Sequence, residues 1–161
     1  MIYIQLIGLL AFCVLVLSYY KKDSNTILTY QITSNLAYAV HYFLLGGLSG
    51  AFISFVGAIR NIIFVKVKQV NILLITIFTI IYLIITIIFY ESLYSIFPMC
   101  ANICYLIFIS KKDKKNILIG AILNSLFWML YSAFVYSIVG IVTESILIIF
   151  NTVQLKMSYE K

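Results

Sequence analysis

Long uninterrupted apolar segments are the feature of this sequence that most constrains its fold. They cover about 2–20, 70–90 and 92–110, and two longer ones cover 27–66 and 116–156. Each approaches or exceeds the roughly 18 residues that a helix needs to cross a hydrocarbon core about 30 Å thick. Charged residues make up 10% of the chain, too few to cover a soluble surface, where about 25% is usual. Because the segments lack the alternation of a β-barrel, the sequence predicts an all-α polytopic membrane protein.

The two longer segments must each fold back once, because each is about twice the length of one crossing. The first contains LLGGLSG at 44–50, whose three glycines permit a tight turn with positive φ. The second contains VYSIVG at 135–140, which is a weaker turn signal. With one turn in each, the sequence predicts seven transmembrane helices.

The basic residues predict the orientation of these helices. With seven spans and an external N-terminus, all 11 lysines and arginines lie in or close to internal loops and the C-terminus. The positive-inside rule therefore predicts an N-terminus outside the cell and a cytoplasmic C-terminus. The net charge of +6 favours contact with the lipid bilayer, through anionic headgroups on its cytoplasmic side, and does not indicate nucleic acid.

An internal repeat divides this single membrane domain, 1–161. KKDSNTIL at 21–28 returns ninety residues later as KKDKKNIL at 111–118. The same offset pairs other polar residues and glycines: Gly50 with Gly140, Asn61 with Asn151, and Lys66 with Lys156. The predicted units are a three-helix repeat at 1–66, a linker helix at 70–90 and a second three-helix repeat at 92–156. One linker helix gives both units the same orientation, and such parallel repeats hold transporter sites at their interface near mid-membrane.

Four segments of the chain resemble a known family. QLIGLLAF, LSYYKK, AYAVHYFLLGGLSGAFIS and IRNII are similar to the bacterial YgjV inner-membrane family, and this resemblance covers almost the full length. The 3+1+3 plan and the size also resemble the SWEET sugar facilitators and their semiSWEET and PQ-loop relatives. These resemblances imply a multi-pass protein of the bacterial inner (plasma) membrane and a role in transport.

The second unit shows the SWEET-like resemblance and its limits. FWMLYSAFVYSIVGIVTE is similar to the SWEET stretch that runs from W-x-x-Y to a cavity asparagine. Trp128 and Tyr131 match this stretch, and Glu144 stands where the asparagine is expected. The corresponding residues of the first unit are Tyr38, His41 and Ser54. The Pro–Gln pair of PQ-loop proteins is missing. Without a symmetric asparagine pair, we expect a solute other than a neutral sugar, or a proton-coupled one.

Polar residues recur at three- and four-residue steps and therefore share helix faces. They form one stripe at Gln31, Ser34, Asn35, Tyr38, His41 and Tyr42, and another at Asn124, Trp128 and Tyr131. Because polar side chains avoid lipid, these faces should line either a cavity or the contacts between helices. The predicted substrate-binding residues are Tyr38, Ser54, Asn61, Trp128, Glu144 and Asn151.

Three ionisable residues are predicted inside the membrane. Glu144 is interpreted as a cavity residue that binds solute or carries a proton, or as a carboxylate that reaches the outer boundary. His41 is expected at a similar depth; it is either a proton-coupling partner of Glu144 or a hydrogen-bonded structural group. Arg60 either extends its head to the internal interface or acts as a gate or charge partner.

The sequence contains no motif of an enzyme or of a metal site. The cysteines have no accompanying histidine or carboxylate, and no phosphate loop or Ser–His–Asp set occurs. We therefore expect no catalytic activity, no metal and no cofactor. The predicted function is a small-solute transporter or facilitator, proton-linked or not, and the alternative is a non-transporting interaction or assembly protein. The sequence leaves the substrate and the oligomeric state open, a homo-oligomer included.

Overall fold

The computed structural model describes residues 2–159. Within this range the chain forms seven α-helices and a short 3-10 helix, and no strand. The elements are α1 (Ile2–Tyr19), α2 (Ser24–Leu44), α3 (Leu48–Lys66), α4 (Ile72–Ile88), η1 (Leu93–Ser95), α5 (Ile96–Ile109), α6 (Lys114–Phe134) and α7 (Ile138–Tyr159). The prediction of an all-helical chain with seven helices is confirmed.

The helices differ in their individual capacity to cross a membrane. By length and composition, α1, α3, α6 and α7 are each long and apolar enough to do so. Helices α4 and α5 are apolar but shorter, with 17 and 14 residues. Helix α2 has 21 residues but is more polar, because it carries the longest of the predicted polar stripes. Its polar face must be covered by other helices if α2 lies in hydrocarbon.

The two helical hairpins turn at positions related by the ninety-residue offset. The α2–α3 turn contains Gly46 with φ of +83°, and the α6–α7 turn contains Tyr136 with φ of +55°. A tyrosine adopts this left-handed conformation at a higher cost than a glycine, which explains the weaker turn signal of the second hairpin. The predicted turns included Gly50 and Gly140. The structure instead places both glycines inside α3 and α7, because both helices begin earlier.

The repeated KKD sequence ends in two equivalent helix N-caps. The carboxylates of Asp23 and Asp113 each accept the backbone N–H three residues further on, at 2.8 and 3.1 Å. Lys112 ties the surrounding connections together, because its ammonium donates to the Val67 carbonyl oxygen and to Asn25 Oδ1. The repeated sequence thus starts α2 and α6 in the same way.

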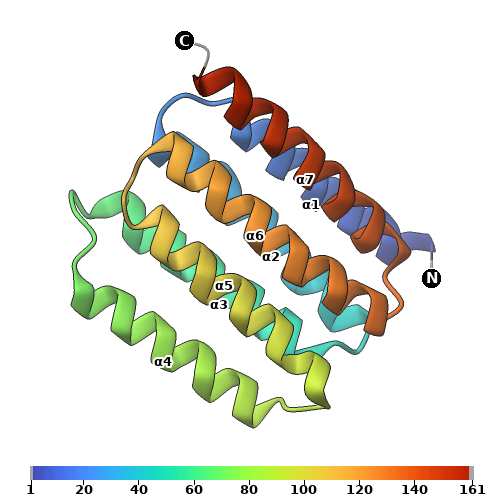
Figure 1. The fold of residues 1–161 in the computed structure, drawn as a ribbon. Coiled ribbons are helices and arrows are strands. Elements are labelled where there is room, and N and C mark those ends of the chain that lie inside the picture. The colour runs from blue at the N-terminus through green and yellow to red at the C-terminus, as the bar shows by residue number, and fades with distance from the viewer. Residues whose placement is uncertain (1, 160–161) are drawn as a thin grey trace.

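The helices are arranged in two layers, α1–α2–α3 and α5–α6–α7, with α4 at one edge beside α3 and α5 (Figure 1). Between the layers, α1 contacts α7 and α3 contacts α5. Helices α2 and α6 meet between the layers at their last turns, where the Tyr42 and Ser132 hydroxyls are 3.0 Å apart. These two residues are themselves ninety positions apart, which is the offset of the sequence repeat.

The lysines gather at one end of the bundle. The α1–α2, α3–α4 and α5–α6 connections and the end of α7 lie together there (Figure 1), and we name this the basic end. The opposite end holds the α2–α3, α4–α5 and α6–α7 connections, which contain no lysine or arginine, and we name it the turn end.

Candidate functional site

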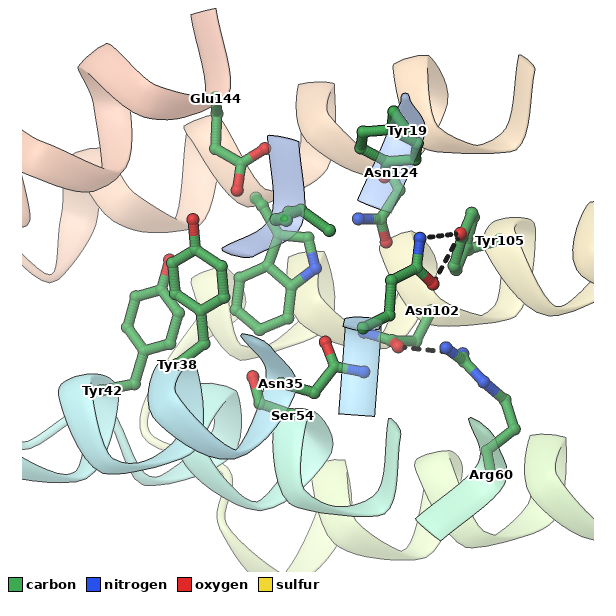
Figure 2. Close-up of a pocket in the computed structure, with 13 residues that line it drawn as sticks. Tyr19, Asn35, Tyr38, Tyr42, Ser54, Arg60, Asn102, Tyr105, Asn124 and Glu144 are labelled. Carbon is green, nitrogen blue, oxygen red and sulfur yellow. Dashed lines mark hydrogen bonds between the residues drawn. The ribbon is translucent and has the colours of Figure 1, made fainter. Parts of the chain in front are cut away.

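A polar cavity lies between the two layers, in the middle of the bundle. Its volume is about 40 Å³, enough for a few water molecules, since one water needs about 10–15 Å³. Side chains of every helix except α4 line it, and Figure 2 shows them converging on the space between the layers. Four of the six predicted binding residues are among them: Tyr38, Ser54, Trp128 and Glu144.

Glu144 of α7 lies at one end of this cavity (Figure 2). The residue is 4% exposed, and its Oε2 has no hydrogen-bond partner in the described chain. This burial does not fit a carboxylate that reaches the outer boundary. The Tyr38 hydroxyl and Asn124 Oδ1, on other walls of the cavity, are also buried without partners among residues 2–159. Buried polar atoms are nearly always paired, so three unpaired ones facing a cavity indicate a place for a ligand or for water.

Arg60 of α3 lies at the opposite end of the cavity (Figure 2). The residue is 1% exposed. Its Nε and Nη2 donate to Asn61 Oδ1 at 3.1 and 3.0 Å. Its Nη1 donates to the Tyr82 hydroxyl at 3.1 Å and to Asn102 Oδ1 at 3.2 Å. The guanidinium carbon lies 5.3 Å from the centre of the Tyr105 ring. All of these partners are uncharged.

This placement corrects one interpretation of Arg60. Its head does not extend to the internal interface, because its amide and hydroxyl partners hold it inside the bundle. Through them it joins α3 to α4 and α5, and therefore one layer to the other. The second interpretation, a gate or charge partner, stays a prediction.

Asn61 and Asn151, which are equivalent in the repeat, are not among the residues that line the cavity. Asn61 is fixed by Arg60, and its Nδ2 donates to Gln31 Oε1 at 3.5 Å. Asn151 is fully buried, and neither atom of its amide group has a partner in the described chain. The residue that corresponds to Arg60 in the second half is Phe150, which offers no hydrogen-bond donor in its side chain. The two asparagines therefore share a position but not an environment.

His41 lies in the helix contacts beside the cavity rather than among its lining residues. Its Nδ1 is 2.8 Å from the Ile4 carbonyl oxygen of α1, and its Nε2 is 2.9 Å from Ser137 Oγ at the start of α7. Since a carbonyl only accepts, Nδ1 carries the proton and the Ser137 hydroxyl donates to Nε2 in the neutral ring. A Cβ at Gly8 would come within 2.9 Å of the ring. These contacts are those of a structural histidine, and the proton-coupling pair with Glu144 stays a prediction.

Aromatic rings close the cavity toward the turn end. Tyr42 stacks on Trp128 with ring centres 5.0 Å apart and meets Tyr131 edge-on at 5.4 Å. The Tyr131 hydroxyl accepts the backbone N–H of Gly50 in the first turn of α3, at 3.0 Å. Helix α6 thus reaches α3 through Tyr131, as α2 reaches α7 through His41. We name these two contacts the Tyr131 clasp and the His41 clasp.

Comparison with known proteins identifies the family. A family described as a bacterial inner membrane protein, Imp-YgjV, matches residues 2–161. The chain belongs to the YgjV family. The YgjV-family protein is therefore a protein of the bacterial inner membrane, as its sequence predicts. No curated protein and no solved structure matches the chain.

The site of this YgjV-family protein also contains residues that the sequence analysis did not select. Asn102 and Tyr105 of α5 line the cavity, together with Leu15 and Tyr19 of α1. The sequence could have indicated Asn102 and Tyr105, because their three-residue spacing puts two polar side chains on one helix face. Tyr82 gave a weaker signal. Thr79 and Thr86 share its face of α4 at three- and four-residue steps, but its partner Arg60 lies 22 residues away in another helix.

Proposed function

We propose that this YgjV-family protein is a small-solute transporter or facilitator of the bacterial inner membrane. The observation that carries the proposal is the polar cavity between the layers, with unpaired polar atoms on Glu144, Tyr38 and Asn124. Leaving a buried donor or acceptor unpaired costs about 1–3 kcal/mol, and more for a charged group. A fold that only held helices together would gain stability by replacing these groups with apolar ones, so their retention favours a solute site.

The proposal includes a 3+1+3 arrangement in which α1–α3 and α5–α7 are parallel repeats and α4 is the linker. The exchange of contacts between the layers supports it, since α1 with α7 and α5 with α3 are the pairs that a twofold axis would interchange. In this arrangement all seven helices cross the membrane. The basic end faces the cytoplasm according to the positive-inside rule, which leaves the N-terminus outside.

Transport in this arrangement requires the layers to move. A cavity of about 40 Å³ holds water but not a sugar or an amino acid. The rings of Tyr42, Trp128 and Tyr131 and the two clasps close its turn end. Rocking of one layer against the other around the cavity would enlarge it and open it to one side at a time. Glu144 would bind the solute, or carry a proton with it.

Solute flux into liposomes that contain the purified full-length protein tests this function. The panel consists of mono- and disaccharides, amino acids and organic acids, each with and without an inward proton gradient. We expect flux of at least one class, and we expect Glu144→Gln to abolish it. Glu91→Gln is the matched control, because Glu91 lies at the turn end, where its Oε1 accepts the Leu48 backbone N–H, and an amide oxygen accepts equally well.

Each result of the flux experiment has a distinct meaning. Flux that depends on the gradient indicates proton coupling, and flux that does not indicates facilitation. Flux that persists in Glu144→Gln would contradict the role of this carboxyl group. If no solute of the panel enters, the non-transporting interaction or assembly protein becomes the better description.

A further inference from the structure

Among residues 2–159, no group that contacts Arg60 carries a charge that would neutralise it. The guanidinium is 1% exposed, and its partners are two amide oxygens, one phenol hydroxyl and one aromatic ring. A buried ion is costly unless an opposite charge accompanies it, and neutral dipoles offset only part of that cost. Because Arg60 lines the cavity, an anion that enters the cavity can supply the missing charge.

We propose that Arg60 binds the carboxylate of the solute, so that the substrates are small organic acids. The inference rests on the proposed transport function and specifies its substrate class. Of the five N–H groups of a guanidinium, four are used in the bonds to Asn61, Tyr82 and Asn102. The remaining Nη2 hydrogen, together with the Nη1 hydrogen that now bonds Asn102 Oδ1, would give a carboxylate two adjacent donors, the geometry that arginine matches best.

The dimensions of the site favour a compact anion. The cavity volume of about 40 Å³ leaves space for a group of a few atoms before the layers move. Charge-assisted hydrogen bonds are roughly twice as strong as neutral ones, so a carboxylate would displace a neutral acceptor such as Asn102 Oδ1. The apolar and aromatic walls at Leu15 and Trp128 would then contact the remainder of a small acid.

The distance between the two charged residues of the cavity is compatible with this binding mode. Counted from the turn end, Glu144 is six residues into α7 and Arg60 twelve residues into α3. At 1.5 Å per residue, this separates them by about 9 Å in depth. A carboxylate at Arg60 therefore does not share a position with the carboxyl group of Glu144, and the repulsion between them is weaker than between two carboxylates in contact.

Carboxylate binding would also act on the contact between the layers. Arg60 belongs to the α1–α3 layer, and its bond to Asn102 reaches the α5–α7 layer. A carboxylate that takes the place of Asn102 Oδ1 would release this contact. Solute binding and the movement of the layers would thus be linked through one side chain.

The protein contains a built-in reporter for the test, since Trp128 is its one tryptophan and lines the cavity. Fluorescence of the full-length protein in lipid nanodiscs would be titrated with acetate and lactate, and with their uncharged amides, acetamide and lactamide. Sodium chloride at the same ionic strength completes the series. We expect a saturable fluorescence change with the acids and none with the amides or with chloride.

Variants assign the response to Arg60. Arg60→Gln should weaken carboxylate binding at least about tenfold, because the charge-assisted bonds are lost, whereas Arg60→Lys keeps the charge and should lose less. Lys66→Gln removes a positive charge at the basic end, outside the cavity lining, and should bind as the unchanged protein does. Circular dichroism establishes that each variant is folded.

The outcomes separate this inference from the proposed function. Equal responses to acids and amides, equal responses to acids and chloride, or undiminished binding in folded Arg60→Gln would each overturn the inference. The comparison of acids with amides uses the unchanged protein and stands even if Arg60→Gln does not fold. Flux of neutral solutes without carboxylate binding would overturn the inference and leave transport in place. Carboxylate binding without flux of any acid would support the Arg60 site and contradict transport.

Discussion

The two halves of the molecule, α1–α3 and α5–α7, place side chains in equivalent positions and give them different partners. Tyr38 and Trp128 occupy the same position of the repeat, and both line the cavity. A second pair of equivalent residues, Ser54 in the first half and Glu144 in the second, also lines the cavity. The repeat thus preserves where a side chain points, but it does not preserve its chemistry.

Charge is the clearest difference between the halves. The cation of the cavity, Arg60, comes from the first half, and its counterpart is Phe150 in the second. The carboxyl group, Glu144, comes from the second half. Two identical halves would place the same groups at both ends of the cavity. Here one end holds the cation of Arg60 and the other end holds the carboxyl group of Glu144. Such a site can orient a solute.

The equivalent asparagines give the largest expected difference between the halves. Asn61→Leu removes the acceptor of two bonds from a buried guanidinium and should lower the free energy of unfolding by about 3 kcal/mol. Asn151→Leu removes an amide without partners in the described chain and should be neutral or stabilising. Thermal unfolding of both variants in the same detergent measures this. Equal losses of stability would mean that Asn151 is paired through water and that the halves are alike.

A smaller effect is expected where the halves are alike, at the first turns of α3 and α7. A Cβ at Gly50 would come within 2.4 Å of the Tyr131 ring, and one at Gly140 within 2.4 Å of Ser132 Oγ. Gly50→Ala and Gly140→Ala should therefore each cost about 2 kcal/mol by overpacking. In Gly57→Ala, the control, the nearest atom is the Asn35 amide at 3.2 Å. Melting temperatures check the order, and a tolerant Gly140 would show that only the first half is tightly packed there.

Breaking the two clasps should lower the free energy of unfolding by amounts that differ still less from each other. Ser137→Ala leaves both His41 Nε2 and the Gly140 backbone N–H without their partner and should cost about 2 kcal/mol. Tyr131→Phe leaves the Gly50 backbone N–H without its acceptor and should cost about 1 kcal/mol. Both changes should also increase acrylamide quenching of the Trp128 fluorescence, because they loosen the turn end. Unchanged quenching in both variants would show that the clasps do not close the cavity.

The N-caps should give the smallest effect, and a nearly equal one. Asp23→Ala and Asp113→Ala each remove the carboxylate that accepts a backbone N–H and should lower the melting temperature slightly. Hydrogen bonds from Thr26, the backbone N–H first, lower the pKa of the Asp23 carboxyl group. A carboxylate with a lowered pKa stabilises the fold above the unfolded value of about 3.9, and this contribution is lost as the pH falls through the folded pKa. Melting temperatures of Asp23→Ala and the unchanged protein should therefore converge in acid; a constant difference would contradict the ionised cap.

The number of helices could be predicted from the sequence because it depends on local quantities. Segment length, glycine content and the distribution of lysines each act within one helix or one connection. The predicted helix boundaries were less accurate at the turns, where glycine content alone was the guide. Gly50 and Gly140 indicated turns by composition, but their absent side chains serve close packing inside α3 and α7.

The site could be predicted only in part, because its partners come from distant segments. Periodicity found that Tyr38 and Trp128 face inward, but it could not separate neighbours on one face. In α2, Ser34 donates to the Ala11 carbonyl oxygen of α1, and Gln31 pairs with Tyr105 of α5. The partners of Arg60 lie 1, 22 and 42 residues away. Asn61 is the next residue of α3, but Tyr82 and Asn102 lie in other helices, and no pattern within one helix predicts them.

In the proposed arrangement, in which all seven helices cross the membrane, the short helices along one edge would affect the surrounding lipid. Helix α4 has 17 residues, and η1 and α5 form one continuous helical segment, Leu93–Ile109. Each is about 25–27 Å long against a hydrocarbon core of about 30 Å. This hydrophobic mismatch would be met by a bilayer that thins along that edge, or by headgroups that descend toward it. Because Tyr82 of α4 contacts Arg60, this edge lies next to the end of the cavity that holds Arg60. The length of the lipid acyl chains would then affect the packing around Arg60, although no lipid enters the cavity.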